Sequence, residues 1–336
     1  MNLIKNKFES LEKLIGNTPL LEISFTYKGQ ALKIYSKLEY YNFSGSIKDR
    51  MALYILKNAY NQNKIKPNDR IIETTSGNTG ISFASIGSYL NHPVSIYMPD
   101  FMSMERISLI KSFGADIHLV SKKDGGFLKC IELAKKAKSE NSNVFLPSQF
   151  SNTDNIMAHY LSTGPEIWST LVNNGLIPSA FIAGVGTGGT IMGVSRYLKK
   201  MYRKITVHPL EPENSKTLSF GYDGSSHRIE GISDEFVPEI LKLYELDNIV
   251  NVNDGDAIIM AQKLSKELGL GVGISSGANF IGALKILLSK KDADSTVVTV
   301  FPDDNKKYLT TDLMKKEPIK NAYLSKDINL LSIKTL

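Results

Sequence analysis

The sequence predicts an α/β protein in which parallel strands are flanked by helices, and two observations support that prediction. First, short runs rich in β-branched residues alternate with longer amphipathic runs along most of the 336 residues. Second, AFIAGV (180–185) and VVTVF (297–301) are nearly continuous apolar runs, which are typical of strands buried on both faces. Consecutive parallel strands need a crossover between them, and the amphipathic runs can supply it.

Five strand and helix pairs follow one another along the chain. Each predicted helix has apolar residues three and four positions apart, and each predicted strand is a short β-prone run. In chain order the pairs are strand 70–75 with helix 81–91, strand 93–99 with helix 104–114, strand 116–121 with helix 126–140, strand 180–186 with helix 191–202, and helix 278–291 with strand 295–302.

Composition limits the classes of function. With 42% hydrophobic and 22% charged residues the chain is globular, and it has no apolar run long enough to span a membrane, so we expect a cytoplasmic protein without membrane contact. The single cysteine, Cys130, excludes an internal disulfide and is expected to pack in the core. Because 40 Lys and Arg are interleaved with 34 Asp and Glu, small anionic ligands are favoured over nucleic acids. The five histidines lack metal-ligand spacing, and no metal is expected.

Three loops are rich in Gly, Ser and Thr, and each leads into a predicted helix. In a parallel sheet ligands bind at such loops. GVGTGGT (184–190) could hold a phosphate at a helix N-terminus or form only a tight turn, and it lacks the Lys-Ser or Lys-Thr pair of a Walker A loop. TTSGNTG (74–80) offers hydroxyls and an amide that could bind a carboxylate or merely cap a helix. GVGISSGAN (271–279) is the least informative of the three by itself.

A lysine, Lys48, adds an amine to the three loops as a candidate site residue. In SGSIKDR (44–50), Lys48 follows a Ser-Gly-Ser turn and heads the apolar run MALYILKNAY (51–60). An amine, a phosphate loop, a carboxylate loop and the hydroxyl of Ser275 together suit an aldehyde cofactor that carries a phosphate. Lysine can form a Schiff base with such a cofactor, and the amino group of a substrate can displace it.

These motifs give the sequence a resemblance to the fold-type-II pyridoxal-phosphate enzymes, closest to the cysteine synthase and cystathionine β-synthase branch. SGSIKDR, TSGNTG, GTGGT and GISSG occur in the family's order, supported by GNTPLL (16–21), KLEYYN (37–42), FGAD (113–116) and TGPEIW (163–168). The resemblance spans about residues 10–315, and residues 322–336 have no counterpart. It implies a two-lobed, tryptophan synthase β-like fold, pyridoxal 5'-phosphate as cofactor, and a homodimer.

The resemblance also implies a role for each matching residue. Lys48 is expected to form the Schiff base and Asn78 to bond the phenolic oxygen of the cofactor, with Ser275 at its pyridine nitrogen. The neutral Ser275 hydroxyl makes the ring a weaker electron sink, which favours loss of a β-leaving group over transamination. The phosphate is expected at Gly186, Thr187, Gly188, Gly189 and Thr190, and the substrate carboxylate at Thr75, Ser76, Thr79 and Gln149.

One segment departs from the family pattern. HRIEGISDEFVP (227–238) stands where cysteine synthases carry Gly-Ile-Gly-Ala-Gly-Phe-Val-Pro, so Ser233, Asp234 and Glu235 replace three small residues. Asp234 could act as a general acid or base near the β-carbon, or discriminate against anionic leaving groups. Either role favours L-cysteine as substrate. The alternative is a carboxylate that faces solvent or pairs with Arg228.

We therefore expect β-elimination or β-replacement through an aminoacrylate intermediate, with L-cysteine giving hydrogen sulfide and either serine or lanthionine. The first alternative is synthesis of cysteine from O-acetylserine and sulfide. Remoter ones are a nicotinamide-dependent oxidoreductase that uses GVGTGG, and a binding module without catalysis. A smaller mobile domain is expected over 45–150, with the larger domain formed by 1–44 and 151–336. Asp303 and Asp304 are given no direct role.

Overall fold

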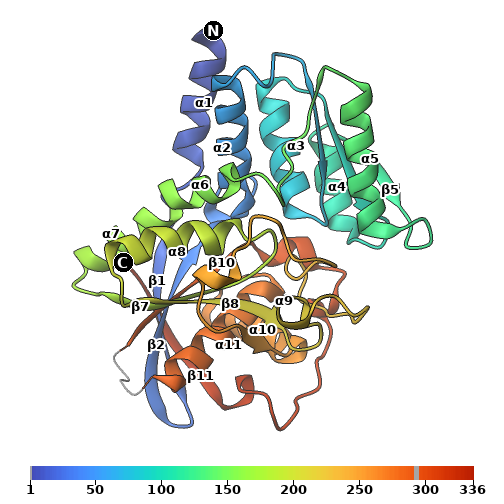
Figure 1. The fold of residues 1–336 in the computed structure, drawn as a ribbon. Coiled ribbons are helices and arrows are strands. Elements are labelled where there is room, and N and C mark those ends of the chain that lie inside the picture. Colours follow the sequence, from blue (N-terminus) through green and yellow to red (C-terminus); the bar gives the residue numbers. More distant parts are fainter. Residues whose placement is uncertain (1, 291–294) are drawn as a thin grey trace.

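The computed structural model describes residues 2–290 and 295–336, and its helices and strands form two sheets with their covering helices (Figure 1). The smaller sheet is parallel throughout and has the strand order β5–β4–β3–β6. Its strands are β3 (Arg70–Thr74), β4 (Val94–Pro99), β5 (Asp116–Val120) and β6 (Val144–Phe145). The helices on this side are α1 (Asn2–Leu14), α2 (Lys48–Asn61), α3 (Asn78–Leu90), α4 (Met104–Ser112) and α5 (Gly126–Glu140).

Helix α1 packs its apolar stripe into the core of the smaller sheet. Phe8 and Leu11 of α1 are buried in one cluster with Leu56 of α2 and Phe83 of α3. Residues three and four apart lie on one face of a helix, so this stripe is the expected result of the sequence pattern. The sequence-based domain division places residues 1–44 with the larger half, and that division, with the mobility it implies, stays a prediction.

The larger sheet is mixed, with the strand order β11–β1–β2–β10–β7–β8–β9. Its strands are β1 (Leu20–Tyr27), β2 (Gln30–Leu38), β7 (Pro178–Gly184), β8 (Thr206–Pro212), β9 (Val250–Val252), β10 (Thr296–Phe301) and β11 (Ile328–Thr335). The strands from β2 through β10, β7 and β8 to β9 are parallel, as the buried apolar runs predict. The remaining helices are α6 (Asp154–Leu161), α7 (Thr163–Asn173), α8 (Gly189–Met201), α9 (Thr217–Phe220), α10 (Asp254–Leu268) and α11 (Ile274–Ser289).

At one edge of the larger sheet the pairings of β11 with β1 and of β1 with β2 are antiparallel, and these three strands were not predicted. β1 and β2 form a hairpin whose two turn residues, Lys28 and Gly29, both have positive φ (49° and 84°), as a two-residue turn that follows the strand twist requires. The C-terminal residues that the family resemblance left unassigned form β11, which pairs with β1. The segment therefore covers the edge of the hairpin, which would otherwise present unpaired backbone groups.

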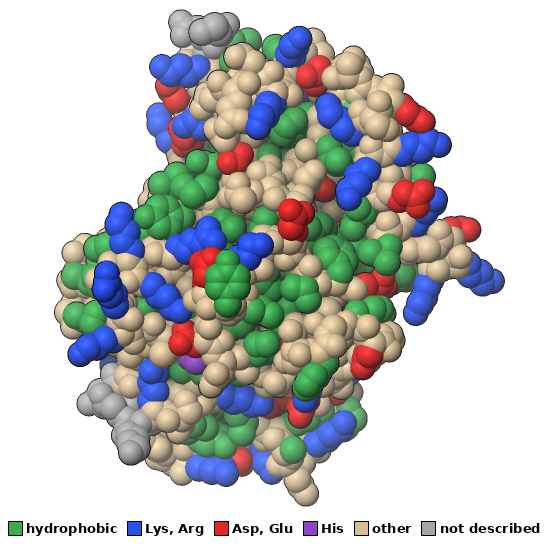
Figure 2. Space-filling model, viewed as in Figure 1, with side chains coloured by type: hydrophobic (Ala, Val, Ile, Leu, Met, Phe, Trp, Pro, Cys, Tyr) green, Lys and Arg blue, Asp and Glu red, His purple; other side chains and the backbone are tan. Residues whose placement is uncertain are grey.

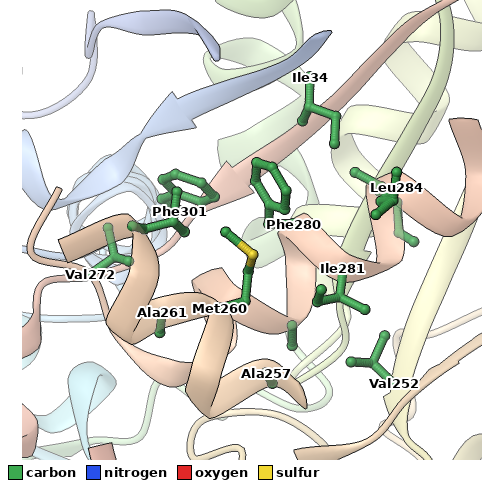
Figure 3. Packing of buried hydrophobic residues seen from close by; sticks show 14 of the residues in the cluster. Ile34, Val252, Ala257, Met260, Ala261, Val272, Phe280, Ile281, Leu284 and Phe301 are labelled. Carbon is green, nitrogen blue, oxygen red and sulfur yellow. The ribbon is translucent and has the colours of Figure 1, made fainter. Parts of the chain in front are cut away.

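Helices cover both faces of the larger sheet. On one face α10 and α11 pack a cluster that contains Met260, Phe280 and Phe301, which lie together in Figure 3. On the other face α7 and α8 bury Leu171 and Leu198 against the strands. The predicted helix over 278–291 corresponds to part of α11, and residue 291 lies outside the described residues.

The surface agrees with the mixed charge pattern of the sequence. On the face shown in Figure 2, Lys and Arg side chains are interspersed with Asp and Glu. Within the described ranges no helix is both long and apolar enough to cross the bilayer. Cys130 is fully buried, which confirms its packing role, and burial raises the pKa of its thiol to about 11. Residues 2–290 and 295–336 contain no group of three or more His, Cys, Asp or Glu arranged to hold a metal.

Candidate active site

A pocket lies where the two halves of the molecule meet, and most of the predicted site residues line it. Residues from the starts of α2 and α3 of the smaller half line it together with residues from the loop after β7 and from the start of α11 of the larger half. The predicted residues that line the pocket are Lys48, Thr75, Ser76, Asn78, Thr79, Gln149, Gly186, Thr187, Gly188, Thr190, Asp234 and Ser275. Gly189 is buried behind the lining, at the first residue of α8.

Lys48 is the first residue of α2 and faces the pocket. The turn before it is fixed from two sides, because Ser46 forms a β-bridge with Asp303 and the Gly45 carbonyl accepts a 2.5 Å bond from Lys307 Nζ. Burial lowers the pKa of the Lys48 amine from its usual range, although the charges of Asp303 and Asp234 oppose the shift. A lowered pKa increases the fraction of neutral amine, which is the form that attacks a carbonyl group.

Asp303 belongs to the site although sequence reasoning gave it no role. Its side chain is fully buried, and Oδ2 accepts hydrogen bonds from Asn78 Nδ2 (2.7 Å) and the Tyr308 hydroxyl (2.5 Å). Asn78 Oδ1 is buried with no hydrogen-bond partner in the described chain. Asn78 and Asp303 are 225 residues apart, so no local pattern predicts this contact.

The loop 184–190 has little room for side chains. A Cβ atom at Gly186 would lie 2.7 Å from the Gly231 carbonyl oxygen, and one at Gly189 would lie 1.9 Å from Asn155 Oδ1. The chain therefore runs close to its neighbours here, and α8 begins with its backbone N–H groups at the pocket. Such a helix start favours an anion. Thr187 Oγ1 accepts a 2.9 Å bond from Asn155 Nδ2, which holds the loop in place.

The predicted carboxylate loop forms hydrogen bonds within itself and with Gln149. Thr79 Oγ1 donates to Gln149 Oε1 at 2.6 Å, and Gln149 Nε2 donates to the Thr74 carbonyl at 2.7 Å. Thr75 Oγ1 accepts from the Gly77 N–H at 2.9 Å. The structure brings Thr75, Thr79 and Gln149 together, and of their four side-chain O–H and N–H donors the Thr79 hydroxyl and one Gln149 N–H have partners.

Asp234 faces the same pocket as Lys48 and has no hydrogen bond or ion pair with any described residue. Burial raises the pKa of its carboxyl to about 6, against the opposing charge of Lys48. The preceding Ser233 has φ 55°, in the left-handed region, and its N–H donates to the Val185 carbonyl at 2.8 Å. The backbone on the N-terminal side of Asp234 is thus tied to the loop 184–190.

The alternative pairing of Asp234 with Arg228 is wrong. Arg228 forms ion pairs with Asp254, Asp312 and Glu317 instead. These three carboxylates occupy the guanidinium, so Asp234 is left to face the pocket.

Sequence reasoning also missed an arginine. Arg106 of α4 lines the pocket with only 2% of its side chain exposed, and its Nη1 donates to Glu230 from the larger half. The guanidinium carbon lies 4.7 Å from the centre of the Tyr308 ring. In the sequence Arg106 is one charged residue in an amphipathic helix, and nothing local distinguishes it from a solvated one.

Three of the supporting motifs, GNTPLL, KLEYYN and TGPEIW, meet Arg50 of SGSIKDR in a buried ion cluster behind Lys48. Arg50 donates to Glu39 (2.6 and 2.8 Å) and to Glu166 (2.7 and 2.8 Å), and Lys37 pairs with Glu166 at 2.7 Å. Hydrogen bonds and charge from Arg50 outweigh the effect of burial and lower the pKa of Glu166 to about 2. Arg50 is two positions from Lys48 on α2, so the cluster, which we call the Arg50 cluster, anchors the start of that helix.

The residues present fit pyridoxal phosphate. They supply a pocket amine with a lowered pKa, a glycine loop at a helix start for a phosphate, and an unpartnered buried oxygen on Asn78. Ser275, at the start of α11, adds a hydroxyl to the pocket lining.

Comparison with known proteins gives the family. Residues 11–303 match the model of the family described as pyridoxal-phosphate dependent enzyme. Cysteine synthase of Staphylococcus aureus is 39% identical over 305 residues, which cover 91% of this chain and 96% of that protein.

Two solved structures are also similar. A hydrogen sulfide-producing enzyme from Fusobacterium nucleatum is 56% identical, with a TM-score of 0.95, and the match covers 99% of this chain and 100% of that one. A second hydrogen sulfide-producing enzyme from the same species is 38% identical, with a TM-score of 0.81, over 89% of this chain and 99% of that one. The chain therefore belongs to the pyridoxal-phosphate dependent enzymes, as a cysteine synthase-like member that acts on the β-carbon of cysteine or of serine derivatives.

Proposed function

We propose that this enzyme releases hydrogen sulfide from L-cysteine, with Asp234 as the group that directs the reaction. The observation that carries the proposal is an unpaired carboxyl with a pKa near 6 in the same pocket as Lys48. Water as the second reactant gives L-serine and hydrogen sulfide. A second cysteine thiol gives lanthionine and hydrogen sulfide.

The proposed roles follow from position. Lys48 joins the cofactor, Gly186 to Thr190 hold its phosphate, and Asn78 and Ser275 contact its ring. Thr75, Ser76, Thr79 and Gln149 surround the substrate carboxylate. Bound at this site, the cofactor supplies an electron-withdrawing ring that acidifies the Cα–H of an amino acid joined to it.

Two proton transfers are assigned to side chains. Lys48 Nζ would hold the cofactor aldehyde and, once free, would take the proton from Cα, because it is the amine of the pocket lining. Asp234 has a pKa of about 6 and is mostly ionised at neutral pH, so its carboxylate accepts the proton of the incoming water or thiol.

Replacing Asp234 by asparagine is expected to lower the rate of sulfide release from L-cysteine by about 100-fold or more, the usual contribution of a general base. The measurement is sulfide and amino-acid product formation by the purified holoenzyme. Glu235→Gln is the matched control, because it removes the neighbouring carboxylate and should keep most of the activity. Unchanged sulfide release by Asp234→Asn would remove Asp234 from the reaction.

The same carboxyl predicts a pH dependence. Its raised pKa means that it is protonated, and inactive as a base, below about pH 6 and ionised above it. We expect kcat/KM for L-cysteine to rise through an acid limb near pH 6. In Asp234→Asn this limb should be missing from the residual activity. A wild-type profile that is flat across this region would contradict the assignment.

Synthesis of cysteine from O-acetylserine and sulfide is the second candidate function, favoured by the relatives named cysteine synthase. An ionised Asp234 opposes it, because acetate leaves as an anion beside a negative charge. Comparing kcat/KM for L-cysteine with that for O-acetylserine plus sulfide decides between the two. The homodimer, the cytoplasmic location and lanthionine as a product remain predictions.

A further inference from the structure

His159 is a buried histidine to which the proposed reaction gives no role. It lies on α6, only 1% of the residue is exposed, and both of its ring nitrogens have a hydrogen-bond partner. Nδ1 lies 2.9 Å from the Thr163 hydroxyl oxygen, and Nε2 lies 3.2 Å from the Thr190 hydroxyl oxygen. Thr163 is the first residue of α7 and Thr190 the second of α8, so the imidazole joins three helices.

Thr190 is the member of this group that lines the pocket. It belongs to the loop that is proposed to hold the cofactor phosphate. Its bond to His159 is the single hydrogen bond that the described residues give to its hydroxyl. The imidazole is buried behind Thr190, so any effect of His159 on a bound phosphate must pass through that hydroxyl.

Close packing between α6 and α8 fixes the position of the ring. A Cβ atom at Gly193 of α8 would lie 2.7 Å from His159 Cβ and would overlap the Ile156 carbonyl oxygen, so the two helices touch where no side chain fits. Gly193 is three residues after Thr190, and residues at that spacing share one face of a helix. His159 is therefore held against the face of α8 that carries Thr190.

The imidazole of His159 is neutral. Burial, together with the positive charges of Arg50 and Lys48, holds the pKa of His159 well below its usual range. A neutral imidazole has one N–H donor and one acceptor nitrogen, and the bond at one nitrogen decides which of the two carries the proton.

Two tautomers are consistent with these contacts, and they present Thr190 differently. If Nδ1 accepts from the Thr163 hydroxyl, Nε2 carries the proton and donates to Thr190 Oγ1. The Thr190 O–H can then donate into the pocket. In the opposite tautomer the Thr190 hydroxyl donates to Nε2, and an anion in the pocket would face only its oxygen lone pairs.

We infer that His159 is a positioning residue for the cofactor phosphate, because a proton on Nε2 leaves the Thr190 hydroxyl hydrogen free to bond it. This inference rests on the proposed phosphate site at Gly186 to Thr190. Phosphate oxygens accept hydrogen bonds, so a bound phosphate favours the tautomer that frees this donor. Thr163 contributes because its hydroxyl supplies the donor that keeps the proton on Nε2.

The test compares pyridoxal phosphate with pyridoxal, which has the same aldehyde but no phosphate. Each is titrated into the full-length apoenzyme and followed by absorbance, so the result does not depend on sulfide release. In His159→Asn, whose amide reaches only about as far as Nδ1, we expect the ratio of the two affinities to fall about 10-fold. In His159→Gln, whose amide reaches about as far as Nε2 and can donate an N–H, most of the ratio should return.

His92→Asn is the matched control. His92 is also buried, and both of its nitrogens are bonded, one to the Tyr60 hydroxyl and one to the Asp69 carbonyl. The change should lower the thermal midpoint and leave the ratio of the two affinities as in the wild type. A fall in stability alone therefore does not imitate the expected result.

Equal weakening of both ligands in His159→Asn, or no change in either, would overturn the inference. If that variant does not fold, Thr163→Val decides: a lowered ratio supports the inference, and an unchanged ratio refutes it. Thr190→Val tests the proposed phosphate site itself. A lowered ratio in Thr190→Val beside an unchanged one in His159→Asn would refute the role of His159 alone, whereas an unchanged ratio in Thr190→Val would refute the phosphate site as well.

Discussion

Lys48→Ala is expected to lower the rate of sulfide release by at least about 1,000-fold, because the change removes both the cofactor's covalent partner and the base for the α-proton. The side chain stands at the first turn of α2 in a pocket formed by both halves of the molecule, and burial lowers its pKa. The position and the lowered pKa of the amine therefore suit it both to bond the cofactor and to remove the α-proton.

Lys57→Ala is the matched control for that experiment. Lys57 is on the same helix but is 41% exposed and pairs with Glu12 at the surface. It should keep the wild-type rate and the cofactor absorbance band. A Lys48→Ala enzyme that retains most of its activity would contradict the central assignment.

Glu39→Gln is expected to lower the free energy of unfolding by about 3 kcal/mol, because it leaves a buried positive charge only partly compensated. Arg50 and Lys37 are balanced by Glu39 and Glu166, so the Arg50 cluster is neutral as a whole. Glu39 is fully buried, and Arg50 bonds both of its carboxylate oxygens. Removing one carboxylate leaves a net positive charge in a buried site that water does not reach.

Urea denaturation of the apoenzyme measures this loss. The control is Glu245→Gln, which breaks a similar two-bond pair with Arg196 at the surface and should cost less than about 1 kcal/mol. Equal losses in the two variants would show that burial does not govern the Arg50 cluster. A loss confined to Glu39→Gln would support its role in holding the start of α2.

Local patterns predicted the parallel strands and the loops after them. Strand and helix periodicity located β7 and α8, and glycine spacing located the loop between them, because these signals lie within a few adjacent residues. The prediction missed β11, because an exposed strand that pairs through its backbone needs no distinctive side chains. Its partner β1 lies about 300 residues earlier in the chain, as the pairing of Thr26 with Asn329 shows.

The missed site residues share another property. Arg106, Glu230, Tyr308 and Asp303 gain their roles from one another. Tyr308 and Asp303 are only five residues apart, but Arg106 meets Glu230 and Tyr308 from a distant part of the chain. Arg106 and Glu230 are 124 residues apart, and no spacing rule connects them. The motifs around Gly16, Lys37 and Glu166 were recognised from the resemblance, yet only the fold shows that they meet at Arg50.

Reduction of the holoenzyme with borohydride, followed by mass spectrometry of its peptides, tests the central claim most directly. Borohydride fixes a carbon–nitrogen link between an aldehyde cofactor and a lysine, and the modified peptide then identifies the lysine. We expect the cofactor mass on the peptide that contains Lys48 and on no other. Modification of a different lysine, or none in an enzyme that is saturated with pyridoxal phosphate, would contradict the account.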